Sequence, residues 1–148
     1  MRTILMLMIF VCISSGVFAG DPDAIIGTWK TPEDKSTIVI YKCGDKYCGK
    51  ITDLKEKVYP PDDKDAGKTK IDRKNPDKSK RQDPVIGLQL MKNFSFKGEI
   101  WQGGTIYDPE KGKTYKCKAT LKGDSLNVRG YIGIPTLGRT SIWTRVAE

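Results

Sequence analysis

Short runs in which apolar and polar residues alternate, separated by turn-forming residues, dominate this chain. Alternation with a period of two is typical of β-strands that bury one face, and no segment keeps the three-and-four spacing of an amphipathic helix. We therefore expect an all-β domain with few helices. The sequence predicts strands at residues 25–29, 35–42, 47–54, 99–102, 105–107, 114–121, 126–131 and 140–146.

Turn-forming residues separate these runs. Gly103-Gly104 suits either a tight turn or a bulge, and the stretches 108–112 and 122–125 combine Asp and Gly in the manner of hairpin turns. About eight strands at such close spacing favour an antiparallel barrel or sandwich.

One long segment, residues 55–84, breaks the alternation. It holds ten Lys and Arg, seven Asp and Glu, and four prolines. Loops of this length within a compact domain are usually either functional or disordered. Two interpretations stay open, a solvated excursion and a loop that caps one end of a barrel. Within the segment, Asp72 and Asn75 are predicted to cap backbone amides around a turn at Pro76.

Residues 1–19 have the pattern of a cleavable signal peptide. Arg2 precedes an apolar run from Ile4 to Phe18, which ends in a small-residue cleavage pattern at Ala19. The run is shorter than the roughly 20 apolar residues that a membrane-spanning helix needs. We expect cleavage after Ala19 and a single periplasmic or secreted domain, residues 20–148; a buried N-terminal helix is the alternative.

The cysteines fit an exported protein. Cys43 and Cys48 flank a four-residue turn between two predicted strands, and outside the cytoplasm a disulfide is the usual state of such a pair. We therefore predict a Cys43–Cys48 disulfide that staples a hairpin. Cys117 lies on the apolar side of its strand and is predicted to be a buried thiol.

The charged residues narrow the possible functions. A net charge of +8 suits anionic partners, but we prefer the plainer explanation that it reflects a soluble, charged surface. The chain has no histidine, which removes the commonest general base, and its acidic residues show no metal-binding spacing. Asp108 is the best placed acid, but turn formation accounts for it. We expect neither an enzyme nor a bound cofactor or metal.

Aromatic and arginine side chains gather on the predicted strands. They combine large apolar faces with polar tips, so they could form either a core with cation–π pairs or the wall of a small-molecule pocket. The residues in question are Trp29, Trp101, Trp143, Tyr107, Tyr131, Arg129 and Arg145. As candidate ligand-lining residues we take Trp101, Tyr107, Arg129 and Tyr131.

Several motifs in fixed order resemble a family of small exported bacterial proteins known as domain of unknown function 2147. The matching segments span residues 26–146 and are 27–30, 48–51, 72–77, 101–109, 112–115, 128–131, 138–139 and 143–145. The resemblance implies an eight-stranded up-and-down barrel of the calycin or lipocalin type. It further implies that Trp29 on the first strand stacks against Arg145 on the last and closes one barrel end. Fold alone does not establish function.

Two functional hypotheses follow. The first is an exported barrel that binds a small apolar or amphipathic molecule at its open end. The second is a protein–protein interaction module or inhibitor, in the envelope or secreted, whose basic loop 55–84 is the contact surface. Nucleic acid is not an expected partner of an exported protein, and no membrane-spanning segment is expected in the mature chain.

Overall fold

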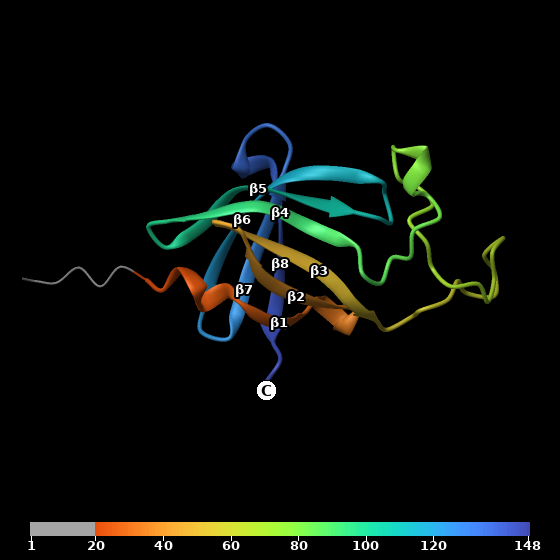
Figure 1. Ribbon diagram of the computed structural model, residues 1–148, viewed down its shortest axis with the longest axis horizontal. Helices are drawn as coiled ribbons and strands as arrows, with labels where there is room; N and C mark the ends of the chain where they lie inside the picture. The colour runs from red at the N-terminus through yellow and green to blue at the C-terminus, as the bar shows by residue number, and fades with distance from the viewer. Residues whose placement is uncertain (1–19) are drawn as a thin grey trace, which may run out of the picture.

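The computed structural model describes residues 20–148, which form a closed barrel of eight antiparallel strands. Each strand pairs with the strands before and after it in the chain, and β1 pairs with β8 to close the barrel (Figure 1). The predicted all-β up-and-down barrel is confirmed. The predicted signal peptide lies outside the described residues. The strands are β1 (Gly27–Lys30), β2 (Ser36–Cys43), β3 (Lys46–Leu54), β4 (Gln89–Lys97), β5 (Ile100–Asp108), β6 (Lys113–Lys122), β7 (Ser125–Tyr131) and β8 (Arg139–Arg145).

The strands form because alternate side chains can be buried inside the barrel. On β2, Ile38 and Ile40 are 0% and 1% exposed, whereas the residues on either side of them are half-buried. On β7, Leu126 and Val128 are buried in the same alternating manner. Sequence positions two apart point to the same face of a strand, so the apolar set of every strand meets in one core.

The number of predicted strands agrees with the structure, but one strand was missed and another was predicted as two. β4 was not predicted, and the two runs 99–102 and 105–107 form one continuous strand, β5. No turn forms at Gly103-Gly104; instead β5 has a bulge between Trp101 and Gly104, where the register with β6 shifts and Gly103 has φ of +76°. The missing strand and the divided strand therefore cancelled in the count.

The first predicted strand, residues 25–29, was also displaced. Its first residue belongs to the 3-10 helix η1 (Pro22–Ile25), which Asp21 caps by accepting a hydrogen bond from the amide of Asp23. The strand itself begins at Gly27, where φ is +143°, so the chain turns sharply from η1 into the barrel wall.

Helix η1 covers one end of the barrel. The indole nitrogen of Trp29 donates to the carbonyl of Ile25 at 3.0 Å, and that of Trp101 donates to the carbonyl of Pro22 at 2.9 Å. The guanidinium of Arg145 lies 4.2 Å from the centre of the Trp29 ring and donates to the carbonyls of Ala24 and Ile26. These contacts seal this end, which we call the closed end.

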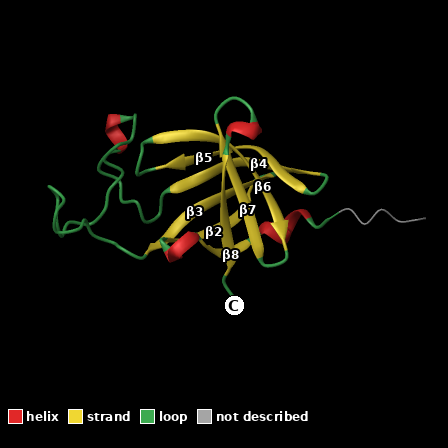
Figure 2. Cartoon of the chain, turned by 180° about the vertical axis from the view of Figure 1, so that it is seen from behind, coloured by secondary structure: helices red, strands yellow, loops and turns green. Residues whose placement is uncertain are grey.

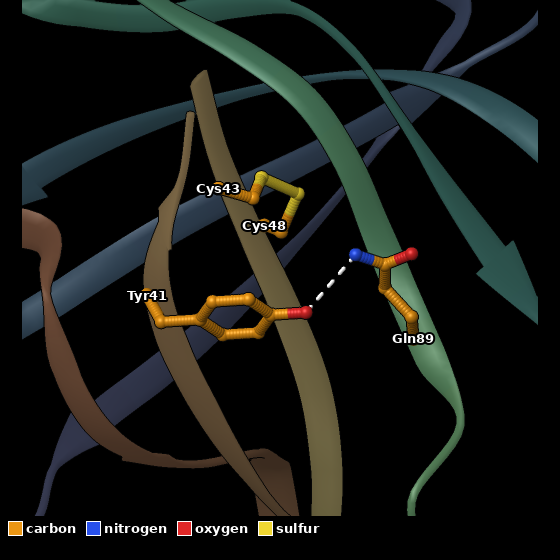
Figure 3. The surroundings of a disulfide bond; sticks show 4 residues. All are labelled: Tyr41, Cys43, Cys48 and Gln89. Atoms are coloured by element: carbon orange, nitrogen blue, oxygen red, sulfur yellow. Dashed lines mark hydrogen bonds between the residues drawn. A yellow bond between two sulfur atoms is a disulfide. The ribbon is translucent and has the colours of Figure 1, made fainter. Parts of the chain in front are cut away.

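A disulfide joins Cys43 and Cys48 at the hairpin between β2 and β3, as predicted, with their Cα atoms 5.9 Å apart. Figure 3 shows this disulfide beside a hydrogen bond, 3.0 Å long, that the side-chain amide of Gln89 donates to the hydroxyl of Tyr41. Because Tyr41 lies on β2 and Gln89 on β4, this bond bridges the outer face of β3.

The opposite end of the barrel carries the longer connections. They include the 3-10 helices η2 (Pro32–Asp34), η3 (Lys78–Lys80) and η4 (Pro135–Leu137), which appear as short red segments in Figure 2. Loop 55–84 leaves β3 here and projects beyond the barrel on the side away from η1 (Figure 1). Within residues 20–148, no helix has the length and apolar character needed to cross a bilayer.

Candidate functional site

A cleft of about 1270 Å³ opens at the end of the barrel opposite η1. Its walls combine the inner faces of the strands with the connections 31–35, 55–88, 109–112 and 132–138. The cleft therefore includes the half of the barrel interior farther from η1, and it continues into the groove between the barrel mouth and loop 55–84.

Apolar side chains form the inner part of the cleft. They come from six strands and the end of the long loop, and each is at most 9% exposed except Ile106, which is half-buried. They are Ile38, Ile51, Leu54, Val85, Leu90, Ile106, Val128 and Trp143. Such a surface favours the apolar part of a ligand because its burial removes that part from water.

A few hydroxyl groups interrupt this apolar wall. Tyr115, Tyr131 and Ser141 border the cleft and are half-buried. The hydroxyl of Ser141 accepts a hydrogen bond of 3.0 Å from the indole nitrogen of Trp143, which fixes the orientation of that ring. A cleft with an apolar base and a small number of hydroxyls fits an apolar or amphipathic molecule.

Loop 55–84 is fastened to the barrel by Asp72, which is only 1% exposed. Its two carboxylate oxygens accept hydrogen bonds of 2.6 Å each, one from the hydroxyl of Tyr107 on β5 and one from the side-chain amide of Asn75. Burial, and next the hydrogen bond to this carboxylate, raise the pKa of Tyr107 well above its ordinary value. The tyrosine thus stays a neutral donor, and the buried carboxylate is satisfied.

The turn between β5 and β6 makes a second attachment. The Lys74 ammonium donates to the carbonyl of Glu110 at 2.8 Å, and the backbone of Lys74 passes directly over Gly112. A Cβ atom on Gly112 would lie 2.1 Å from the Lys74 carbonyl oxygen, so only glycine permits this approach. The loop is therefore an ordered wall of the cleft rather than a solvated excursion.

Arg73 holds the outer part of the loop together. Its guanidinium binds Asp63 at 2.6 and 2.8 Å and Asp65 at 2.9 Å, and it lies 4.0 Å from the centre of the Tyr59 ring. The hydrogen bonds from Arg73 hold the pKa of Asp63 far below its usual range. The Tyr59 hydroxyl donates to the carbonyl of Ile71 at 3.0 Å and closes this unit.

Charged side chains surround the mouth of the cleft. Among them, Glu56 pairs with Lys70 at 3.7 Å and Asp108 pairs with Lys111 at 3.8 Å. Six other charged residues that border the cleft form no ion pair within residues 20–148; they are Glu33, Lys35, Lys55, Lys74, Glu110 and Arg139. The mouth can therefore accommodate the polar end of a bound molecule.

The structure separates the four candidate lining residues. Tyr107 and Tyr131 border the cleft. Trp101 is also buried, but it lies at the closed end, where its ring packs against Phe96 with centroids 4.7 Å apart. Arg129 lies on the outer face of β7 and donates to the carbonyl of Pro135 at 2.7 Å. Neither Trp101 nor Arg129 borders the cleft.

Sequence reasoning missed most of the cleft wall. The aliphatic residues of β2, β3 and β4 carry no sign that distinguishes a cavity lining from a filled core. Tyr115 and Trp143 were available as signals, since both lie on the apolar side of their predicted strands. Which half of the barrel such a residue occupies depends on the register, which the sequence does not display.

Comparison with known proteins gives one family and one structure. The model of a family described as "Uncharacterized protein conserved in bacteria (DUF2147)" matches residues 27–145. A solved structure titled "Protein HP1028 from the human pathogen Helicobacter pylori belongs to the lipocalin family" superposes with a TM-score of 0.70 over 84% of each chain, at 20% sequence identity. No curated protein matches the chain. At this identity the structural likeness establishes a lipocalin-like fold.

Proposed function

The chain belongs to the bacterial family of uncharacterized proteins DUF2147, and from this premise we propose that its barrel binds one small apolar or amphipathic molecule. The observation that carries the proposal is the cleft of about 1270 Å³ with an apolar base and hydroxyls on its wall. Eight-stranded barrels of the lipocalin type are wide enough to hold one small ligand. The apolar part of the ligand would lie between Val128 and Trp143, with its polar end at the charged mouth.

The size of the cleft fits this role. Ligand pockets commonly measure roughly 300–1,000 Å³, and this cleft also includes the groove beneath loop 55–84. Tyr59, Ile71 and Val85 from the loop region complete its wall, so a ligand in the barrel would contact both parts. In this proposal loop 55–84 forms part of the ligand-binding site.

The first experiment is native mass spectrometry of the protein purified gently from its own source, followed by denaturing release. We expect one small apolar or amphipathic molecule per chain. The delipidated protein should then bind 1-anilinonaphthalene-8-sulfonate with quenching of Trp143, the tryptophan in the cleft wall. A Trp143→Phe variant identifies this signal, because Trp29 and Trp101 lie at the closed end.

Filling the cleft gives the decisive variant. A Cβ atom on Gly130 would lie 3.5 Å from Tyr115 and 3.6 Å from Ile106, an ordinary contact distance, so it fits without displacing the backbone. Because Gly130 borders the cleft, the remaining carbons of a leucine there would take up space that a ligand needs. Gly130→Leu should therefore abolish dye and ligand binding while the protein stays folded by circular dichroism. Thr52→Leu on the exposed face of β3 is the matched control. Undiminished binding by Gly130→Leu would refute the proposed site.

We also propose that the protein is exported. The Cys43–Cys48 disulfide supports this, because such bonds persist in oxidising compartments. Cell fractionation with N-terminal sequencing should find a mature chain that starts at Gly20 in the periplasm or medium. A cytoplasmic, unprocessed chain would contradict this proposal. The interaction module using loop 55–84 and the absence of enzymatic activity stay predictions.

A further inference from the structure

The loop between β7 and β8 exposes apolar side chains at its tip. Ile132, Ile134 and Leu137 are 67%, 58% and 76% exposed, and they are among the most exposed large apolar residues of the described chain. Ile132 and Leu137 also border the mouth of the cleft. A cluster of this kind on a protein surface marks a site of interaction more often than scattered single residues do.

Hydrogen bonds hold this loop in its apolar-exposing conformation. The Arg129 guanidinium donates to the carbonyl of Pro135 at 2.7 Å and to the hydroxyl of Thr140 at 2.8 Å. Gly138 lets the chain return close to β7, since a Cβ there would lie 2.5 Å from the carbonyl oxygen of Gly130. Because Arg129 points outward from β7, the loop lies over the outer side of the β6–β8 wall.

The same outer side is basic. On β6, Cys117 and Ala119 are buried, so the alternate residues Lys116, Lys118 and Lys122 point outward. Between residues 113 and 147, Asp124 in the turn at the closed end is the one acidic residue. The register places Lys116 beside Tyr131, where the apolar loop begins. We call these cations, together with the apolar loop, the β6–β8 face.

Arg129 on β7 adds a further cation to this face and lies directly opposite Lys118. Lys118 and Arg129 are cross-strand partners, and like charges in this arrangement destabilise a sheet. Lys118, Lys122 and Arg129 also surround a shallow depression of about 220 Å³, together with the polar side chains of Thr120, Asn127 and Thr140. No residue of the described chain neutralises Lys118 or Arg129 through an ion pair. An external anion would relieve the repulsion.

We propose that the β6–β8 face docks onto an anionic lipid surface. The apolar tip would enter the headgroup region while the lysines contact lipid phosphates, a combination of two individually weak contributions that is typical of proteins bound at a membrane interface. Ile142, 55% exposed on the same outer side of β8, extends the apolar part. A soluble anionic partner would use the cations and leave the aliphatic tip in water.

The test is sedimentation with vesicles, one set of pure phosphatidylcholine and one containing phosphatidylglycerol. We expect binding to the anionic vesicles only, weakened by salt. Lys116→Gln/Lys118→Gln should reduce the affinity by about fivefold for each lost cation. Ile134→Ser/Leu137→Ser should reduce it by about tenfold or more. All four positions are at the surface or on the outer face, so the variants should fold normally, which circular dichroism checks.

Matched controls lie away from the face. Lys50→Gln removes an exposed cation from β3, which lies three strands from both β6 and β8 around the barrel, and Ile26→Ser removes an apolar side chain near the closed end that is 37% exposed. Both should bind vesicles like the native protein. Absence of binding to anionic vesicles, or native-like binding by both double variants, overturns the proposal. The proposal is also overturned if the protein binds soluble dextran sulfate as tightly as it binds anionic vesicles and only the lysine double variant loses this binding. That result would assign the face to a soluble anionic partner. Vesicle binding is measured without a cleft ligand, so this result is independent of the proposed function.

Discussion

At the scale of single residues, Cys117 shows how the core constrains chemistry. Its side chain is 1% exposed on the inner face of β6, and burial raises the pKa of its thiol from 9.0 to about 12. The folded state therefore disfavours the thiolate, which is the reactive form of cysteine. Tyr47 behaves similarly, since burial and its hydrogen bond to Asp23 raise its pKa to about 12.

The raised pKa of Cys117 predicts a loss of stability in alkaline solution. The unfolded thiol releases its proton above about pH 9, whereas the folded thiol keeps it until about pH 12. The contribution of the Cys117 thiol to the free energy of unfolding is thus fully present below pH 9. Between pH 9 and about pH 12 it declines by up to about 1.4 kcal/mol per pH unit. Urea unfolding at several pH values should give a shallower decline for Cys117→Ala. Parallel curves for the two proteins would contradict the assignment.

Residue placement also decides how much of the cleft could be predicted. Tyr107 was predicted to line a site because it lies near a strand end, and the structure places it at the mouth. On β7 the inward positions are Leu126, Val128 and Gly130, so Arg129, which lies between two of them, points outward. Trp101 does point inward, but it lies in the half of the barrel next to the closed end and not in the half that holds the cleft. Parity is readable from sequence, whereas depth along the barrel depends on register and on the bulge in β5.

At the scale of elements, loop 55–84 differs most from what composition suggests. Its charges resemble those of a solvated segment, yet Asp72 and Lys74 attach it to β5 and to the turn before β6. Asp72 and Asn75 were predicted to cap amides within the loop. Asn75 does accept from the amide of Asp77 at 2.9 Å, but the Asp72 side chain instead reaches Tyr107 on another element. Sequence proximity could not indicate that contact.

Replacing Gly112 should detach the loop. The added methyl group of Gly112→Ala would collide with the Lys74 carbonyl, and φ of +65° also strains any residue with a side chain. Gly123→Ala is a matched control, since φ there is +59° and nothing lies within 4 Å. The backbone strain at positive φ should cost each variant about 1–2 kcal/mol of unfolding free energy. Only Gly112→Ala should accelerate trypsin cleavage within loop 55–84; equal cleavage of both variants would show that the loop is held elsewhere.

The strand that escaped prediction has an irregular pattern for a physical reason. On β4, Leu90 and Met91 are both buried although they are adjacent, and Asn93 has φ of +62°. The register with β3 shifts on both sides of Gly49, which pairs with Met91. Such a bulge disrupts the alternation of apolar residues by which strands are predicted.

At the scale of the whole molecule, the barrel depends on contacts between its first and last strands. β1 and β8 share the pairs Trp29–Arg145 and Lys30–Thr144. Stacking of Arg145 on Trp29, together with its hydrogen bonds to η1, reinforces this junction. The resemblance of the sequence to a known family implied the stacking, which composition and periodicity did not reveal.

Arg145→Lys should weaken this junction although it keeps the charge. A lysine ammonium lacks the planar fork that stacks on Trp29 while donating to two carbonyls. We expect a loss of about 2 kcal/mol in the free energy of unfolding, the usual contribution of hydrogen bonds from a charged donor, measured by urea denaturation. Arg139→Lys, on an exposed arginine at the opposite end, should change stability by less than about 0.5 kcal/mol. Equal effects would show that the fork is dispensable.

The junction of β1 and β8 also bears on how fast the protein folds. Seven of the eight strand pairings join consecutive strands, and five of those connections are short. Hairpins with short connections close early because little chain entropy is lost. Only the β1–β8 pairing requires residues near the two ends of the domain to meet. The slowest step of folding is therefore expected to be barrel closure, and a chain waiting at that step exposes two unpaired strand edges to its neighbours.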